Sequence, residues 1–197
     1  MDYMSHLQKD KKLASILTQD PFVLKRKKNI PIRLMASIMS QQLSTKVAAV
    51  IYKRFLALYN GKEPTVEAVL ETPNEVLRSI GLSNAKVGYV KNVALFCIEN
   101  GITDRKISTM SDESIIALLV QIKGVGKWTV EMLLMFGLGR EDVFAVDDLG
   151  IQQAMCKLYK IDTTHKKTMQ EKMLKLAQKW TPYRTYACLH LWNWKDS

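Results

Sequence analysis

Two glycines stand close together in the segment Ile122-Lys123-Gly124-Val125-Gly126-Lys127-Trp128-Thr129, which joins two stretches whose apolar residues have helical spacing. We expect a turn too tight for any residue but glycine at these two positions, and such a hairpin points consecutive backbone N–H groups at the start of the second helix toward solvent. A phosphate binds well at such a helix start. The alternative interpretation is an ordinary corner between two helices, in which glycine only permits the bend. The segment alone leaves both interpretations open.

Two adjacent carboxylates, Asp147 and Asp148, follow the apolar stretch Val143-Phe144-Ala145-Val146 and precede Leu149-Gly150-Ile151. Asp148 is placed to accept a backbone N–H group at the start of the next helix, where the helix dipole also favours negative charge. A carboxylate at such a position can equally stabilise a developing positive charge or orient a water molecule. This segment alone does not separate a helix cap from a catalytic group.

Two further segments accompany these two. Ile38-Met39-Ser40-Gln41-Gln42-Leu43-Ser44 lies earlier in the chain, and Tyr183-Arg184-Thr185-Tyr186-Ala187-Cys188-Leu189-His190-Leu191-Trp192 lies later. In this order, the four segments closely resemble the helix-hairpin-helix DNA glycosylases, and within them the 3-methyladenine DNA glycosylase II branch. The resemblance runs from about residue 30 to the end of the chain. We expect the helical core alone, because the segment before it is too short for the β-rich domain that longer relatives carry there.

The resemblance implies a monofunctional enzyme of base excision repair, which hydrolyses the N-glycosidic bond of alkylated purines such as 3-methyladenine and 7-methylguanine in double-stranded DNA. It assigns the catalytic carboxylate to Asp148, whose spacing to Ile151 matches the family. Asp147 is then a neighbour that can cap the helix. The residues implied to line the base pocket are Trp128, Glu131, Met132, which stands where the best-known relative has an aromatic residue, and Tyr183.

The resemblance also implies two contacts with DNA. The glycine hairpin would bind the backbone, and Gln42 or Leu43 would fill the gap left by the displaced base; the alternative for Leu43 is a core position at a plain helix end. The implied DNA-binding residues are Gln41, Gln42, Leu43, Lys123, Gly124, Val125, Gly126, Lys127 and Thr129. A monovalent cation held by the backbone carbonyls of Ile122 and Val125 is implied as well.

Trp128 occupies the position at which bifunctional relatives such as endonuclease III have a lysine that forms a Schiff base. Lys127 precedes it by one residue, which turns a helical side chain by about 100°. We therefore expect Lys127 to contact phosphate and Trp128 to stack on the base through a cation–π interaction, the alternative being a core tryptophan. The iron–sulfur loop of those relatives needs four cysteines, and only Cys188 lies near that part of the chain.

Composition favours a polyanionic partner and no cofactor. The formal net charge is +10 and the pI is about 9.5, which is typical of nucleic-acid-binding proteins. Three cysteines and three histidines are too scattered for a metal site built from side chains. The longest uncharged apolar run, Ile115 to Val120, is far shorter than the roughly twenty residues of a membrane span. We expect no membrane contact, a monomer, and residence in the cytoplasm at a bacterial nucleoid or in the nucleus of a eukaryote.

The elements that must position these residues are helices. Glycine and proline are scarce and fall between segments with helical spacing, so we predict an all-α protein of about ten helices. Ser44, Thr72, Ser83 and Ser111 are predicted to cap helices. The predicted ranges are about 5–17, 31–42, 44–59, 73–81, 83–101, 111–120, 127–137, 148–159, 167–179 and 182–194. We expect one glycosylase domain over 1–197 with two helical lobes and a DNA-binding cleft, the lobes being 31–105 and 106–197 with the N-terminal segment.

Two other functions fit parts of the pattern. A non-catalytic helix-hairpin-helix module that only binds DNA would keep the hairpin and the basic charge, but it would need neither Asp148 nor Trp128. The presence of both residues favours the enzyme. A glycosylase for deaminated or mismatched bases would use the same carboxylate with a different pocket, and the sequence leaves this alternative open.

Overall fold

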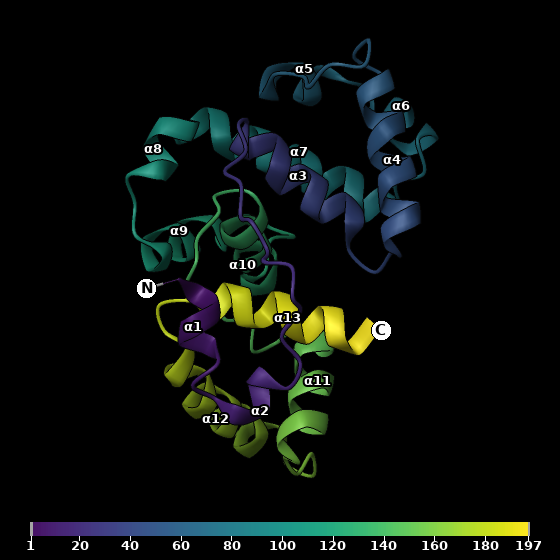
Figure 1. Ribbon diagram of the computed structural model, residues 1–197. Coiled ribbons are helices and arrows are strands. Elements are labelled where there is room, and N and C mark those ends of the chain that lie inside the picture. The colour runs from purple at the N-terminus through teal and green to yellow at the C-terminus, as the bar shows by residue number, and fades with distance from the viewer. Residues whose placement is uncertain (1, 197) are drawn as a thin grey trace. The chain divides into compact units, whose positions relative to one another are not determined.

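The computed structural model describes residues 2–196, apart from the side chain of Thr45. All regular structure in this part of the chain is helical, with thirteen α-helices, one 3-10 helix and no strand (Figure 1). The predicted all-α class is confirmed, although about ten helices were expected. The described chain divides into two compact units. We call residues Arg26–Leu138 the hairpin unit, and the residues up to Lys25 together with those from Gly139 onward the carboxylate unit.

The hairpin unit contains eight helices in chain order. They are α3 (Ile30–Ser40), α4 (Thr45–Ala57), α5 (Val66–Glu71), α6 (Asn74–Ser79), α7 (Asn84–Glu99), α8 (Asp104–Ser108), α9 (Asp112–Leu119) and α10 (Lys127–Phe136). The carboxylate unit contains α1 (Tyr3–Leu7), α2 (Lys11–Ala14), α11 (Leu149–Tyr159), α12 (Lys166–Ala177), the 3-10 helix η1 (Gln178–Trp180) and α13 (Arg184–Asp196).

The division into units differs from the predicted lobes. The N-terminal segment groups with the C-terminal helices, but α9 and α10 group with the preceding helices rather than with the following ones. The reason is that α10 packs directly on α3 as well as on α9. The boundary therefore falls after Leu138 instead of near residue 105.

Helix α3 is the centre of the hairpin unit, where it packs against α4, α7 and α10 (Figure 1). Its apolar side chains are buried around most of its circumference, among them Ile32, Leu34, Met35 and Ile38. Its start is capped from α8, because the carboxylate of Asp104 accepts the backbone N–H groups of Asn29 and Ile30 at 2.7 Å each. This central helix carries the Gln41–Leu43 turn at its C-terminal end.

Serine caps begin three helices as predicted. The hydroxyl groups of Ser44, Ser83 and Ser111 each accept a backbone N–H group three residues later, in α4, α7 and α9 respectively. The prediction for Thr72 was wrong. Its hydroxyl donates to the carbonyl of Ala68 and pairs with that of Tyr59, while Pro73 stands at the start of α6 without a side-chain cap.

Three further differences concern short helices. The predicted helix over 5–17 is two helices, because the carboxylate of Asp10 accepts the backbone N–H groups of Lys12 and Leu13 and so starts α2 separately. Helices α5 and α8 were not predicted, and they are six and five residues long.

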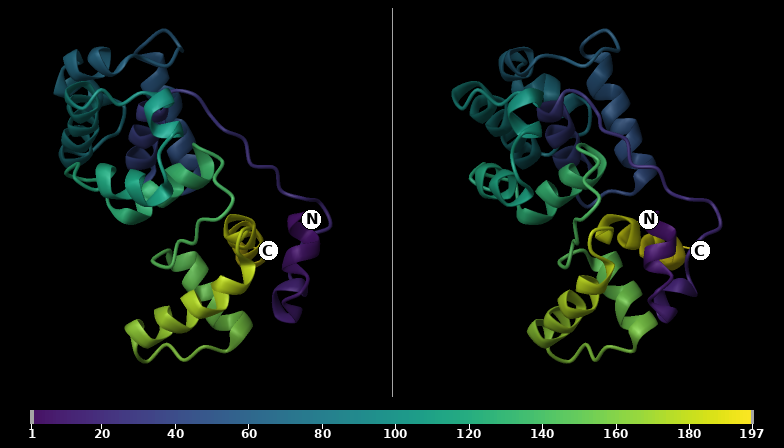
Figure 2. Two further views of the ribbon diagram at one scale, coloured as in Figure 1. Left: turned by 90° about the vertical axis from the view of Figure 1, so that its left-hand side faces the viewer. Right: turned by 60° about the vertical axis from the view of Figure 1, so that its left-hand side comes forward.

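In the carboxylate unit, α11 packs against α13, and the N-terminal helices complete the group (Figure 2). Arg184 at the start of α13 binds both carboxylate oxygens of Asp142, at 2.7 and 3.0 Å. This bidentate pair and the buried Thr185, which bonds Val143 and Arg140, attach α13 to the segment that leads into α11. The apolar residues Val143 to Val146 are buried, so the chain arrives at Asp147 from the core.

Within residues 2–196, no helix has the length and apolar character that crossing a membrane requires. The three cysteines are free thiols, and Cys156 is half-buried whereas Cys97 and Cys188 are buried.

Candidate functional site

The glycine hairpin joins α9 to α10, and one of its two glycines is required by the fold. Gly124 has a φ of +100°, and a Cβ atom there would lie 2.2 Å from Cγ of Tyr89. The turn is closed by the backbone N–H of Val125, which donates to the carbonyl of Ile122 at 2.9 Å. Both apolar side chains are buried, which anchors the hairpin in its unit.

Gly126 is different, and the expectation that the turn itself requires two glycines was wrong. Its φ of −93° is ordinary, and a Cβ atom there would meet nothing within 4 Å. Gly126 is the N-cap of α10 and provides no side chain to bond the first N–H groups of that helix. Its missing side chain keeps the start of α10 accessible to a group from outside the chain.

The first turn of α10 directs Lys127 toward solvent and Thr129 into the hairpin unit. Lys127 is exposed, and its ammonium lies 3.2 Å from Oε1 of the buried Glu131. Thr129 is 2% exposed and accepts a hydrogen bond from Nε2 of Gln41 at 3.0 Å. Its hydroxyl therefore lies inside the unit, so that only its backbone N–H group, in the first turn of α10, remains as a candidate for binding DNA. Lys123, just before the hairpin, is exposed.

The turn that follows α3 projects two side chains outward. Gln42 has a φ of +59°, in the left-handed region, and its side chain is exposed. Leu43 is 38% exposed, so the alternative of a core position at this helix end is wrong. Gln41 points the other way and bonds Thr129. The ammonium of Lys86, whose pKa burial lowers from its usual value, donates to the carbonyls of Met39 and Gln41.

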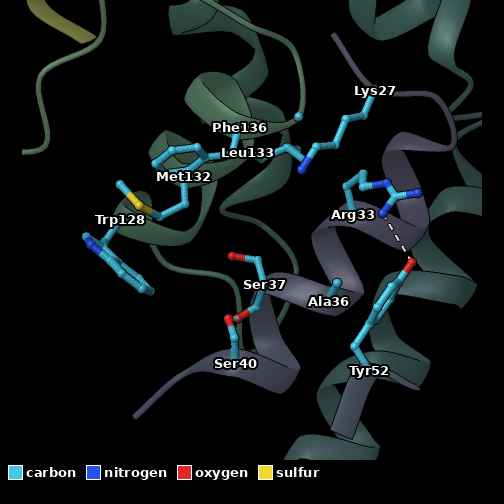
Figure 3. A pocket seen from close by; sticks show the side chains of 11 residues that line it. Lys27, Arg33, Ala36, Ser37, Ser40, Tyr52, Trp128, Met132, Leu133 and Phe136 are labelled. Atoms are coloured by element: carbon cyan, nitrogen blue, oxygen red, sulfur yellow. Dashed lines mark hydrogen bonds between the residues drawn. The ribbon is translucent and has the colours of Figure 1, made fainter. Parts of the chain in front are cut away.

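A cavity of about 450 Å³ lies between α3, α4 and α10 in the hairpin unit (Figure 3). Trp128, Met132 and Phe136 form its apolar side, and Lys27, Arg33 and Tyr52 lie at the opposite side. Trp128 is half-buried at this cavity rather than enclosed in the core. Glu131 is not among the lining residues, because it points into the unit toward Lys127.

The polar side of this cavity is held by α3 and α4. Arg33 donates to the hydroxyl of Tyr52 at 3.1 Å and forms an ion pair with Glu63. Ser37 and Ser40 line the cavity between the two sides. The lining thus combines an aromatic and thioether wall with hydroxyl and cationic groups, which is the composition of a ligand pocket.

In the carboxylate unit, Asp148 is the N-cap of α11. Its Oδ1 accepts the backbone N–H of Ile151 at 2.9 Å and the indole N–H of Trp192 at 2.8 Å. Gly150 lets this arrangement form, since a Cβ atom there would lie 3.0 Å from the Trp192 ring and 3.1 Å from Oδ1. The carboxylate is half-buried and fixed by two donors, so it is both a helix cap and an oriented charge.

Asp147 does not cap α11. It is exposed and accepts a hydrogen bond from the side chain of Gln170 at 2.7 Å. Tyr183 is half-buried in the same unit, and its ring packs edge-on against His6 and Tyr186, with centroids 5.4 and 6.1 Å away. Of the predicted pocket residues, Trp128 and Met132 share one cavity, whereas Tyr183 belongs to the carboxylate unit.

Four supporting residues were not predicted. Trp192 fixes Asp148, Lys86 binds the turn after α3, Tyr89 packs under Gly124, and Asn92 donates to the carbonyl of Lys123 at 3.1 Å. Trp192 lies in the last of the four segments that carry the family resemblance, but nothing in that segment indicated that it bonds Asp148. Within residues 2–196, no group of three or more histidine, cysteine or acidic side chains could hold a metal ion. The cation at Ile122 and Val125 stays a prediction.

The chain matches the model of the HhH-GPD superfamily of base excision DNA repair proteins over residues 35–179. DNA-3-methyladenine glycosylase 1 of Schizosaccharomyces pombe is 37% identical over 162 residues, which cover 81% of this chain and 70% of that protein. A putative DNA-3-methyladenine glycosylase of Bacillus subtilis is 32% identical over 166 residues, covering 81% and 57%. The matched region is thus little more than half of the Bacillus protein.

Two solved structures have the same fold. The 3-methyladenine DNA glycosylase of S. pombe in complex with abasic DNA superimposes with a TM-score of 0.86 at 32% identity, covering 98% of this chain and 96% of that chain. A DNA-3-methyladenine glycosidase from Bacillus halodurans gives a TM-score of 0.80 at 32% identity, covering 98% and 88%. Because the family model matches most of the chain and these relatives share its helices from end to end, the chain belongs to the HhH-GPD superfamily of base excision DNA repair proteins.

Proposed function

We propose that the chain is a monofunctional DNA glycosylase that releases alkylated purines of the 3-methyladenine and 7-methylguanine type from double-stranded DNA. The observation that carries the proposal is the Asp148 carboxylate, fixed by Ile151 and Trp192 at the start of α11. The similar proteins of S. pombe and B. subtilis are named DNA-3-methyladenine glycosylases, which supports the same substrate class here.

The proposed reaction is a hydrolysis. A purine alkylated at N3 or N7 carries positive charge and leaves readily, so the bond from C1′ to the base nitrogen breaks first and the electron pair departs with the base. The sugar becomes an oxocarbenium-like cation, which the negative charge of Asp148 stabilises. Water then bonds to C1′ and loses a proton, for which a carboxylate is a suitable acceptor. The products are the free base and an intact strand with an abasic site.

The base must first leave the duplex stack, at a cost of a few kcal/mol. We assign the grip on the backbone to the hairpin and the first N–H groups of α10, with Lys123 and Lys127 as exposed cations beside them. Gln42 or Leu43 would fill the vacated space, since both side chains project outward. Gly126 supports this assignment, because the fold itself leaves room for a side chain there.

We assign the cavity of α10 to the displaced base. The Trp128 indole offers a stacking face to an electron-poor methylated purine, an interaction worth roughly 0.5–2 kcal/mol. Met132 and Phe136 extend the same wall by one and two helical turns. The Trp128 face favours a cationic base over a neutral one. Of the two cations across the cavity, Lys27 and Arg33, the latter is already paired with Glu63.

DNA is the partner, and we expect the protein to act as a monomer. Action on the chromosome would place the protein at the nucleoid of a bacterium or in the nucleus of a eukaryote.

Release of radiolabelled base from methylated duplex DNA tests the function directly. We expect chromatography to identify free 3-methyladenine or 7-methylguanine, with the strand left intact until it is treated with hot alkali. Release of uracil or hypoxanthine from deaminated duplexes, without release of methylated purines, would contradict the substrate class. Tight DNA binding without release of any base would show that the protein is a non-catalytic DNA-binding module.

A further inference from the structure

Both turns that the proposed function assigns to DNA rest on one helix, α7. Lys86, Tyr89 and Asn92 recur every three residues and so form one stripe along this helix. Lys86 contacts the turn after α3, while Tyr89 and Asn92 contact the hairpin. The buried apolar residues of α7, which are Val87, Val90, Val93, Ala94 and Cys97, anchor the helix in the hairpin unit, where it packs on α3 and α5. The stripe therefore lies on a helix that its buried apolar residues hold against α3 (Figure 1).

The ammonium of Lys86 donates to the carbonyl of Met39 at 2.9 Å and to that of Gln41 at 2.7 Å. These carbonyls lie at the C-terminal end of α3, where a helix leaves carbonyls without internal partners and carries partial negative charge. The next residue, Gln42, has a φ of +59°, which a residue other than glycine adopts only at an energetic cost. Two charge-assisted hydrogen bonds just before Gln42 hold the backbone in this conformation.

The same helix holds the hairpin through two other contacts. The side chain of Asn92 donates to the carbonyl of Lys123, and the Tyr89 side chain packs so closely under Gly124 that no Cβ atom fits. Lys86 and Asn92 lie six residues apart, about 9 Å along the helix axis. The two turns are thus attached to one rigid element.

We propose that Lys86 is a positioning residue for the side chain that fills the gap in the duplex, and that α7 fixes its register with the hairpin that binds phosphate. This inference rests on the proposed function. Without Lys86, Gln42 and Leu43 would no longer be held outward, whereas the hairpin would keep its own contacts with Tyr89 and Asn92. Loss of the ammonium should therefore weaken recognition of a gap in the stack and leave general duplex binding intact.

The test compares two duplexes, one undamaged and one with a tetrahydrofuran abasic site opposite 2-aminopurine, whose fluorescence reports insertion of a side chain into the gap. Lys86→Met keeps the aliphatic stem and removes both hydrogen bonds. We expect its preference for the abasic duplex to fall about tenfold, which corresponds to about 1.4 kcal/mol. The fluorescence change should disappear, and affinity for undamaged duplex should stay within about twofold.

Lys91→Met is the matched control, since Lys91 lies on the same helix and has no hydrogen bond or ion pair with any residue the structure describes. It removes the same charge and should keep the wild-type preference. Lys86→Arg, which retains donors, should restore most of it. Should Lys86→Met lose its cooperative thermal transition, Lys86→Ala, which also removes both donors, supplies the same test.

An unchanged preference in a folded Lys86→Met variant, or an equal loss in Lys91→Met, would overturn the proposal. Failure of Lys86→Arg to differ from Lys86→Met would do the same. Excision of methylated purine by the wild-type protein is measured in parallel. A wild-type protein that inserts a side chain at the abasic site but releases no base would refute the proposed function and leave the role of Lys86 standing.

Discussion

The charge of Asp148 can be separated from its role as a helix cap. Asparagine retains an oxygen that accepts the N–H groups of Ile151 and Trp192, so Asp148→Asn should fold with near wild-type stability. It removes the negative charge that opposes the oxocarbenium-like cation. We expect single-turnover excision to fall by about a hundredfold or more, with affinity for duplex DNA retained.

Asp147→Asn is the control for this prediction, because it removes an adjacent charge that is exposed and bound to Gln170. Its excision rate should stay within about threefold of wild type, since exposed charges are screened by solvent. An inactive Asp147→Asn beside an active Asp148→Asn would reverse the assignment. Activity in both variants would show that neither Asp147 nor Asp148 is the catalytic carboxylate.

The side chain of Lys127 bears on the type of product. Its ammonium is paired with Glu131, and a Schiff base needs a neutral amine aimed at C1′ of the sugar. We therefore expect borohydride to trap no covalent adduct between protein and DNA during excision. A trapped adduct that disappears in Lys127→Ala would show that the enzyme is bifunctional, while base excision itself would still stand.

Sequence patterns indicated single site residues better than the contacts that support them. Asp148 was recognisable both as a cap and as a carboxylate in a familiar segment. The hydrogen bond from Trp192 joins positions 44 residues apart, and that from Lys86 to Gln41 joins positions 45 apart. Such pairings depend on how helices pack, and no local periodicity or spacing encodes them.

At the scale of the element, the two hairpin glycines should behave oppositely. Gly124→Ala forces a Cβ atom against Tyr89 at a left-handed φ, so we expect a loss of about 1–3 kcal/mol in the free energy of unfolding. Gly126→Val meets nothing in the fold and should change stability by no more than about 1 kcal/mol, since glycine is only a moderate N-cap. Its side chain would instead block a phosphate.

Urea titrations and duplex-binding measurements on both variants check this. Gly126→Val should lose affinity for undamaged and alkylated duplexes alike, because phosphate contacts position the protein without reading the base. Wild-type affinity in a folded Gly126→Val variant would show that the hairpin does not contact DNA. The contrast was not predictable from the sequence, where both glycines appeared equally necessary for the turn.

Long helices with a clear cap were predicted more accurately than short ones. Helices α4 and α7 were predicted closely, because serine caps precede them and glycines follow their long apolar periodicity. Helices α5 and α8 have fewer than two turns, which is too short for a periodic pattern to emerge. Thr72 has the right type for a cap, but its hydroxyl bonds the end of α5 instead. Residue type and spacing alone do not show whether the Thr72 hydroxyl bonds the end of α5 or the start of α6.

At the scale of the whole molecule, the histidines are divided unequally between the two units. His6, His165 and His190 all lie in the carboxylate unit, and the hairpin unit has none. His190 on α13 is fully buried, and its Nδ1 accepts the backbone N–H of Thr18 at 3.2 Å, with Phe22 packed edge-on against the ring. That hydrogen bond requires Nδ1 to be unprotonated, so acid should act on the carboxylate unit first.

Burial lowers the pKa of His190 from its usual 6.5 to about 4. Between these values the unfolded chain binds a proton that the folded chain does not, so the free energy of unfolding falls as the pH is lowered. From pH 7 to pH 5 we expect a loss of about 2 kcal/mol in the free energy of unfolding from this group.

Tryptophan fluorescence of a Trp128→Phe protein during urea titration measures this loss in the carboxylate unit. The remaining tryptophans all lie in that unit, and they are Trp180, Trp192 and Trp194. His190→Gln offers an amide oxygen to Thr18 without titrating and should abolish most of the loss, whereas His165→Gln, at an exposed position, should retain it. An equal loss of stability in the His190→Gln protein would assign the acid sensitivity to the carboxylates instead.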